Sequence, residues 1–179
     1  MPTLFKKICL IGNYGVGKTS LIRQFVENQF SDEYHTTIGV KISRKDVEIQ
    51  DEGKVTGVQL IIWDLEGRKD LKSVTIQNLE NQYLTGAHGA VIVGDLTRSE
   101  TITSIPRHID NFLTVNPQGC TIVALNKTDL VDPSASLKSA AVKKSDSVIA
   151  TYRTSAKTGE YVNEIFEVLA HHMVAEKTK

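Results

Sequence analysis

The chain has 179 residues, of which 40% are hydrophobic, and this length suits one well-buried core rather than two domains. Its 21 basic and 21 acidic side chains cancel, so no bulk charge favours nucleic acid or an anionic membrane as an obligatory partner. No apolar run resembles a secretory segment or is long enough to span a bilayer, and two cysteines at the edges of apolar runs suit buried thiols in a reducing compartment. We expect one domain over residues 1–179, located in the cytoplasm, that binds no nucleic acid and reaches a membrane only through partners.

The first predicted strand, Leu4–Ile11, is a continuous apolar run, which is typical of a strand covered on both faces. It runs into Gly12–Thr19, which fits the pattern G-x-x-x-x-G-K-[ST]. A predicted helix follows, with Leu21, Ile22, Phe25 and Val26 on one stripe. Strand, glycine-rich loop and helix in this order predict a phosphate-binding loop rather than an ordinary exposed turn.

The fixed positions of this loop each have a physical reason. Glycines let the backbone leave the strand sharply and turn its N–H groups toward phosphate oxygens. The N-terminus of the following helix also attracts an anion. Lys18 supplies a positive charge for the outer phosphates, and the Thr19 hydroxyl is a candidate Mg²⁺ ligand. The loop alone predicts a nucleoside triphosphate and does not specify the base.

The middle of the chain is predicted to hold a long loop and a hairpin. Residues 28–39 show no sustained period and form a loop long enough to suggest a function. Val40–Ile49 and Val55–Trp63 flank a turn and predict a hairpin. An irregular segment and then a helix capped by Gly86 should follow.

The remainder alternates strands with helices. Strands are predicted at residues 90–95, 121–125 and 148–152, and helices at residues 102–113, 134–144 and 162–169, with Pro106 tolerated because it lies in the first helical turn. This alternation predicts an α/β fold of three layers, with a mostly parallel six-stranded sheet, one antiparallel strand and about five helices. Ligands of such sheets bind beyond the carboxyl ends of the strands.

Two further motifs follow predicted strands. Asp64 ends a strand, and the spacing Asp64-x-x-Gly67 places a carboxylate beside Mg²⁺ and a backbone N–H where a γ-phosphate would lie. This motif is weak alone and gains its meaning from the phosphate loop. Asn126-Lys127-x-Asp129 is more specific, because a carboxylate that accepts two N–H groups from a purine edge selects guanine over adenine.

Ser155-Ala156-Lys157 adds a backbone N–H for the guanine carbonyl and an apolar lysine stem beside the base. With these motifs together, the chain resembles a Ras-superfamily small GTPase with features of the Rab branch. The resemblance rests on these segments: Gly12–Ser20, Thr36–Val40, Trp63–Gly67, Gly86–Gly89, Asn126–Asp129 and Ser155–Lys157.

The resemblance implies roles for particular residues and two switch loops, Phe30–Val40 and Asp64 to about Gln82. Phe30 would pack against the guanine edge, and Thr37 would close over Mg²⁺ and the γ-phosphate. The predicted contacts to GTP or GDP are Tyr14, Gly15, Val16, Gly17, Lys18, Thr19, Ser20, Phe30, Thr37, Gly67, Asn126, Lys127, Asp129, Ser155, Ala156 and Lys157. The predicted Mg²⁺ ligands are Thr19, Thr37 and Asp64. The predicted catalytic residues are Lys18, Thr37, Gly67 and Arg68.

The sequence departs from the family around the γ-phosphate. Most of the family carries Thr-Ala before this glycine and a water-orienting glutamine after it, whereas this chain has Leu65-Glu66-Gly67-Arg68. An arginine has no acceptor for a water proton, although it can stabilise phosphoryl charge. Glu66 is expected to point away from the nucleotide or to pair with a basic residue, and Tyr14 adds bulk where Ras has glycine. We therefore expect a switch that hydrolyses GTP slowly and regulates effector proteins through its two switch loops.

Three alternatives stay open at this stage. The chain could be a scaffold that holds GTP without cycling, or a phosphate-loop kinase or ATPase, which the guanine motif disfavours. It could also be a membrane-anchored trafficking GTPase, because the C-terminus printed here carries no cysteine for prenylation and we expect no direct lipid anchor.

Overall fold

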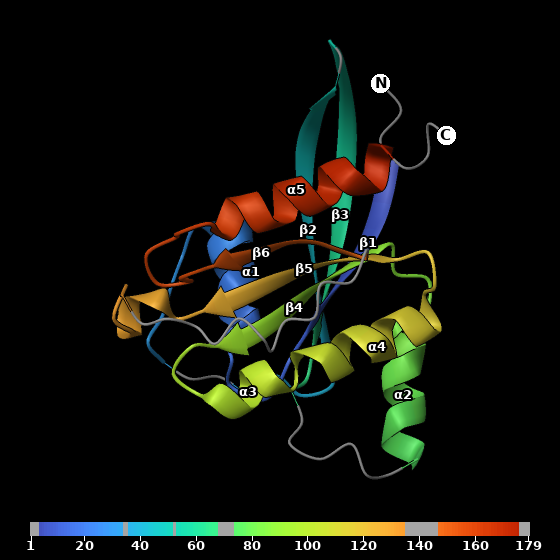
Figure 1. Cartoon of the computed structure of the whole chain (residues 1–179). Helices are drawn as coiled ribbons and strands as arrows, with labels where there is room; N and C mark the ends of the chain where they lie inside the picture. Colours follow the sequence, from blue (N-terminus) through green and yellow to red (C-terminus); the bar gives the residue numbers. More distant parts are fainter. Residues whose placement is uncertain (1–3, 34–35, 52, 68–73, 135–146, 176–179) are drawn as a thin grey trace.

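The structure is a computed structural model, and it describes residues 4–33, 36–51, 53–67, 74–134 and 147–175. These ranges form a six-stranded sheet in the order β2-β3-β1-β4-β5-β6 (Figure 1). The strands are β1 Leu4–Ile11, β2 Val40–Asp51, β3 Lys54–Leu65, β4 Gly89–Asp95, β5 Cys120–Asn126 and β6 Val148–Arg153. The α-helices are α1 Lys18–Glu27, α2 Val74–Leu84, α3 Ser99–Thr103, α4 Ile105–Val115 and α5 Val162–Ala175.

The pairing of the strands confirms the predicted mixed sheet. β1 pairs in parallel with β3 and β4, β4 with β5, and β5 with β6, whereas β2 runs antiparallel to β3. Because the parallel strands share a direction, their carboxyl ends meet at one edge of the sheet. The register places Leu10 of β1 opposite Asp64 of β3, so the loop after β1 begins beside the end of β3.

Apolar side chains cover both faces of the sheet and form two cores. One core joins α1 and α5 to the sheet, where the rings of Phe25 and Phe166 stack with centroids 4.2 Å apart. The other core joins α2 and α4 to the opposite face, with Phe112 fully buried. Figure 1 shows α5 on one side of the sheet and α3 and α4 on the other, which is the predicted three-layer arrangement.

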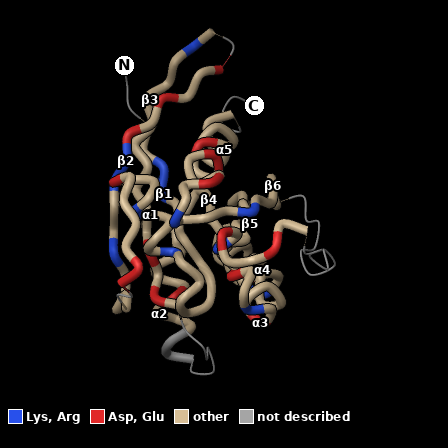
Figure 2. Tube along the Cα trace, turned by 90° about the vertical axis from the view of Figure 1, so that its left-hand side faces the viewer, with Lys and Arg blue, Asp and Glu red and all other residues tan. Residues whose placement is uncertain are grey.

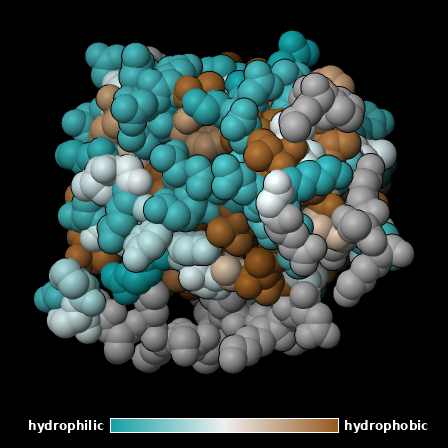
Figure 3. Space-filling view, turned by 90° about the horizontal axis from the view of Figure 1, so that it is seen from above, coloured by the Kyte–Doolittle hydropathy of each residue, from teal (hydrophilic) through white to brown (hydrophobic). Residues whose placement is uncertain are grey.

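The surface of the described chain mixes charges of both signs. Figure 2 shows basic and acidic residues interspersed along β2 and β3, as expected for a chain without net charge. The view onto α5 and the hairpin in Figure 3 is mostly hydrophilic, with apolar residues between. Within the described part of the chain, no helix combines the length and apolarity that crossing a bilayer requires.

One predicted helix differs from the structure. The segment expected as a single helix over residues 102–113 is divided into α3 and α4, and Ser104 separates them. Pro106 lies in the first turn of α4 and has no N–H to donate to the Ile102 carbonyl, so an unbroken helix could not form there. The predicted helix at residues 134–144 lies almost wholly outside the described residues. Gly86 has φ +73°, as the predicted cap after α2 requires.

Candidate functional site

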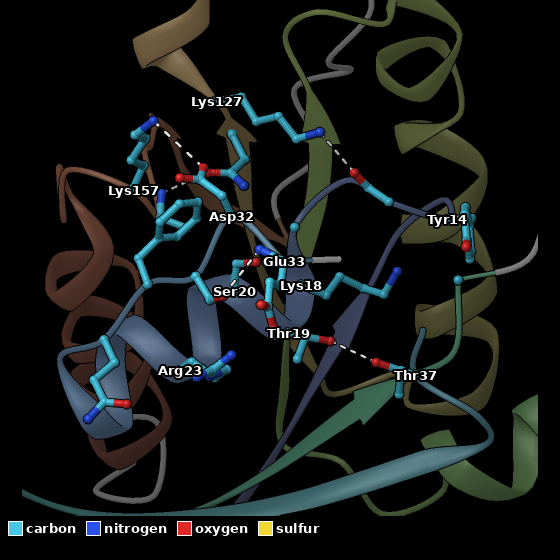
Figure 4. A pocket seen from close by; sticks show the side chains of 18 of the residues that line it. Tyr14, Lys18, Thr19, Ser20, Arg23, Asp32, Glu33, Thr37, Lys127 and Lys157 are labelled. Carbon is cyan, nitrogen blue, oxygen red and sulfur yellow. Dashed lines mark hydrogen bonds and ion pairs between the residues drawn. The ribbon is translucent and has the colours of Figure 1, made fainter. Parts of the chain in front are cut away.

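A cavity of about 270 Å³ lies at the carboxyl edge of the sheet (Figure 4). The residues that were predicted to bind nucleotide and that line it are Tyr14, Gly15, Gly17, Lys18, Thr19, Ser20, Phe30, Thr37, Gly67, Asn126, Lys127, Asp129, Ala156 and Lys157. Val16, Asp64 and Ser155 are buried behind this lining. Arg68 lies outside the described residues. The structure therefore brings the predicted motifs from four separate loops to one place.

The phosphate loop has the backbone conformation that its glycines permit. Gly15 has φ +72° and Gly17 has φ +103°, and a Cβ on Gly17 would lie 2.2 Å from Asn126 Nδ2. Lys18 is 6% exposed and donates through Nζ to the carbonyl oxygens of Gly12 at 2.8 Å and Asn13 at 3.0 Å. Burial lowers the pKa of Lys18 to about 8, so an anion in the cavity would stabilise its charged form.

Three consecutive carbonyl groups of this loop point away from the cavity and accept hydrogen bonds from side chains. Arg98 donates to Tyr14 O at 2.7 Å, Lys127 to Gly15 O at 3.0 Å, and Asn126 to Val16 O at 3.0 Å. Fixing the carbonyls on one side leaves the intervening N–H groups for the cavity side, where an anion would bind. These donors follow β4 and β5, so the neighbouring strands set the shape of the loop.

Asp95 connects two of these donors. Its Oδ2 lies 2.6 Å from Lys127 Nζ and 3.1 Å from Arg98 Nε, and the carboxyl side chain is 1% exposed. Burial opposes ionisation, but the hydrogen bonds from Lys127, Thr97 and Arg98 hold the pKa of Asp95 below its ordinary value. The ionised carboxylate therefore keeps both cations directed at the phosphate loop.

Three oxygen-bearing side chains converge beside Lys18. Thr19 Oγ1 lies 2.7 Å from Thr37 Oγ1 and donates to Asp64 Oδ2 at 2.5 Å, and Thr37 Oγ1 lies 3.4 Å from the same carboxylate oxygen (Figure 4 shows the two threonines facing each other). Asp64 is 1% exposed, and its Oδ1 has no hydrogen-bond partner within the described ranges. Burial raises the pKa of Asp64. Hydroxyl and carboxylate oxygens around a buried, unpartnered oxygen fit a magnesium ion, which prefers such ligands.

Glu66 and Gly67 close the cavity opposite this group. A Cβ on Gly67 would lie 2.5 Å from Lys18 Nζ and 2.7 Å from Tyr14 Cα, so only glycine fits so close to the phosphate loop. The Glu66 carboxylate accepts the backbone N–H of Gly39 at 3.0 Å. Glu66 was expected to point away from the nucleotide or to pair with a basic residue, and it binds a backbone amide of the first switch.

The other end of the cavity carries the motif predicted to bind a base. Ser155 Oγ donates to Asp129 Oδ1 at 2.6 Å, which orients that carboxylate. Asn126 Oδ1 accepts the backbone N–H of Ala156 at 3.2 Å, so the loops after β5 and β6 are joined. Lys157 Nζ lies 3.7 Å from Asp32 Oδ1 across the mouth of the cavity, and both side chains are exposed (Figure 4).

Sequence analysis did not find three contributors to this site: Asp95, Arg98 and His108. His108 of α4 is buried, and its Nε2 lies 3.1 Å from Asn13 Oδ1 in the phosphate loop. Asp95 ends a strand, as Asp64 does, so its place at the carboxyl edge of the sheet was an available signal. Arg98 and His108 carry no such signal, because only the packing of α3 and α4 brings them to the loop.

Comparison with known proteins agrees with this geometry. A profile described as the Ras family matches residues 7–175. The chain belongs to the Ras family. The Ras-related protein Rab-22A of Homo sapiens is 32% identical over 162 residues, which cover 89% of this chain and 79% of that protein. Rab-1C of Dictyostelium discoideum is 35% identical over 168 residues, covering 92% and 78%. The GTP-binding protein ypt5 of Schizosaccharomyces pombe is 32% identical over 177 residues, covering 97% and 80%.

The predicted resemblance to a Rab-like small GTPase is therefore confirmed. Membership of the Ras family makes the chain a GTP-binding regulatory switch of the GTPase class. Ras-family GTPases bind GTP or GDP with Mg²⁺ and work through effector and regulator proteins. The fold prediction is confirmed as well, since a sheet with five parallel strands and one antiparallel strand is the phosphate-loop GTPase fold.

Proposed function

We propose that this small GTPase holds GTP or GDP with Mg²⁺ in the cavity at the carboxyl edge of the sheet and hydrolyses GTP slowly. The convergence of Thr19, Thr37 and Asp64 beside Lys18 carries this proposal. Thr37 belongs to the first switch loop and Asp64 begins the second, so their meeting point can sense whether a third phosphate is bound. We further propose that residues 1–179 act as one domain.

The end of the cavity at Asp129 would hold the base. The Asp129 carboxylate, oriented by Ser155, accepts two N–H groups of guanine, and adenine has no matching donor pair. Ala156 supplies a backbone N–H, and the stems of Lys127 and Lys157 lie along the base. Phe30, which is 37% exposed at the cavity wall, covers the remaining edge.

The other end would hold the phosphates. The N–H groups of Tyr14 to Ser20 surround the phosphates, and the Lys18 ammonium neutralises the outer two. Thr19, Thr37 and Asp64 would hold Mg²⁺, which when bound neutralises charge on the phosphate oxygens. Gly67 directs its backbone N–H at the third phosphate, and the close approach of Gly67 to the phosphate loop supports that role.

Slow hydrolysis follows from the residues near the third phosphate. Arg68 replaces the glutamine that orients water in most of the family, and a guanidinium donates hydrogen bonds but accepts none. Tyr14 occupies space beside the same phosphate, and its hydroxyl lies 3.4 Å from Thr36 Oγ1. Lys18, Thr37 and Gly67 then stabilise charge, while the attacking water lacks a base-like partner.

Single-turnover hydrolysis of preloaded GTP, measured with and without Arg68→Gln, tests the proposal. Restoring one oriented hydrogen bond to water in the transition state should raise the rate up to about tenfold. The expected result is slow cleavage by the wild type and faster cleavage by the variant. Fast cleavage by the wild type, slowed by the substitution, would contradict it. Bound GTP that neither protein cleaves during long incubation would identify the non-cycling scaffold instead.

Competition between GTP and ATP for the cavity separates the GTPase from a kinase or ATPase. Because Asp129 pairs with donors that only guanine has, GTP should displace a fluorescent GDP at concentrations at least about a thousandfold below ATP. Equal displacement by ATP would refute the assignment of the base site. Asp129→Ala is the variant in which the preference should vanish.

Effector and regulator proteins would bind the switch loops. Ile38 is 86% exposed and Ile42 is 48% exposed, so an apolar surface lies directly beside Thr37. Among the other predicted contact residues, Ser31 and Asp32 lie at the cavity mouth, and residues 34 and 35 fall outside the described ranges. Contact with a membrane would come through such partners.

A further inference from the structure

The Glu66 side chain completes the pairing of β2 and β3 at the cavity end of the hairpin. Val40 of β2 lies opposite Leu65 of β3, so Gly39 and Glu66 form the next facing pair. The Glu66 N–H donates to the Gly39 carbonyl at 2.9 Å. In return, the Gly39 N–H donates at 3.0 Å to Glu66 Oε2, a side-chain oxygen. One residue therefore binds both polar groups of the Gly39 backbone.

This pair joins the two switch loops at their most sensitive points. Gly39 follows Thr37 by two residues, and Glu66 directly precedes Gly67. The intervening Ile38 is 86% exposed, so apolar burial does not hold this stretch in place. Thr37 nevertheless lies against Thr19, and Gly67 lies against the phosphate loop. The hydrogen bonds of Gly39 are the contacts that fix the end of the first switch.

We propose that Glu66 is a positioning residue that holds the first switch closed through Gly39 and thereby increases the affinity for GTP over GDP. The proposal rests on the proposed function, because it takes Thr37 and Gly67 as the groups that contact the third phosphate. A bond from the protein itself does not depend on that phosphate. The closed arrangement is therefore populated before GTP binds, and GTP spends less of its binding energy on closing the loop.

The carboxylate also carries a charge, which acts in the opposite direction. Glu66 is close enough to Lys18 to contribute to the electrostatic environment of that ammonium, so it would also repel a third phosphate. Hydrogen bonding and repulsion predict opposite effects on GTP affinity when Glu66 is removed. The sign of the measured change therefore distinguishes them.

Glu66→Ala and Glu66→Gln separate the two effects. Alanine, the usual residue of the family, removes both the bond and the charge, whereas glutamine keeps an acceptor oxygen for the Gly39 N–H and removes only the charge. Glu48→Ala is the matched control, because Glu48 is an exposed acid of β2 far along the hairpin. The affinities for GDP and for a non-hydrolysable GTP analogue are measured with Mg²⁺ for all four proteins.

Glu66→Ala should weaken the GTP analogue about tenfold relative to GDP, as the loss of one hydrogen bond to an ionised acceptor implies. Glu66→Gln should keep most of the wild-type ratio, and Glu48→Ala should keep all of it. In the GDP-bound protein, amide hydrogen exchange at Gly39 should accelerate about tenfold in Glu66→Ala alone.

Tighter binding of the GTP analogue by both Glu66 variants would overturn the proposal in favour of repulsion. Unchanged exchange at the Gly39 amide in Glu66→Ala would overturn it as well. Failure of the wild type to bind either nucleotide would instead refute the proposed function. Exchange at the Gly39 amide, followed in the same nucleotide-free protein, would then decide separately whether Glu66 holds this residue.

Discussion

His108 is the residue whose ionisation should govern the acid stability of this protein. Its Nε2 meets Asn13 Oδ1 at 3.1 Å, while its Nδ1 is buried without a hydrogen-bond partner in the described structure. Protonation would place an unsatisfied N–H in the core. Burial, with smaller contributions from the charges of Arg107 and Lys18, lowers the pKa of His108 to about 4.

The sign of the pH effect follows from this lowered pKa. The unfolded chain binds the proton near pH 6.5 and the folded chain only near pH 4, so the stabilisation is complete above about pH 6.5 and is lost as the pH falls toward 4. Between pH 7 and pH 5, the free energy of unfolding of the wild type should fall by about 2 kcal/mol more than that of His108→Gln. Urea unfolding of both GDP-bound proteins at the two pH values measures this difference. An equal fall in both would show that His108 is not responsible.

At the scale of elements, the phosphate loop depends on the segments that follow β4 and β5. Arg98 reaches Tyr14 O at 2.7 Å while its Nε contacts Asp95 at 3.1 Å. The guanidinium can do both because its N–H groups form a planar fork, and a lysine ammonium cannot. The start of α3 is therefore part of the nucleotide site, although α3 itself is only five residues long.

Arg98→Ala should release GDP about tenfold faster than the wild type, because a charge-assisted bond to the loop is lost at a partly exposed side chain. Arg98→Lys should release it at a rate close to that of the alanine variant, since the fork is absent. Dissociation of a fluorescent GDP measures both rates. Arg107→Ala, which removes an exposed arginine of α4, serves as the control and should leave the rate unchanged. Release from Arg98→Lys at the wild-type rate would show that charge alone holds the loop.

The elements and motifs could be predicted because their signals are local. The apolar runs of β1, β4 and β5 and the motifs at their ends lie next to each other in sequence, and the carboxyl edge of a parallel sheet brings them together. The contacts of Arg98 with Tyr14 and of His108 with Asn13 join residues 84 and 95 positions apart. Such contacts depend on how α3 and α4 pack, which periodicity does not specify. The same limit applies to Glu66, whose partner Gly39 follows from strand register.

At the scale of the whole molecule, the nucleotide site links parts of the chain that pack in different cores. The cavity takes residues from the loops after β1, β3, β5 and β6, so a bound nucleotide contacts every segment that must stay assembled. A ligand that binds only the folded state, present at a thousand times its dissociation constant, stabilises it by about 4 kcal/mol. Removal of Mg²⁺ and nucleotide with a chelator should therefore lower the unfolding temperature by about 10 °C. GDP with Mg²⁺ should restore it, whereas ADP with Mg²⁺, the matched control, should not. Restoration by both would mean that the phosphates alone bind and that the Asp129 end of the cavity contributes no selectivity.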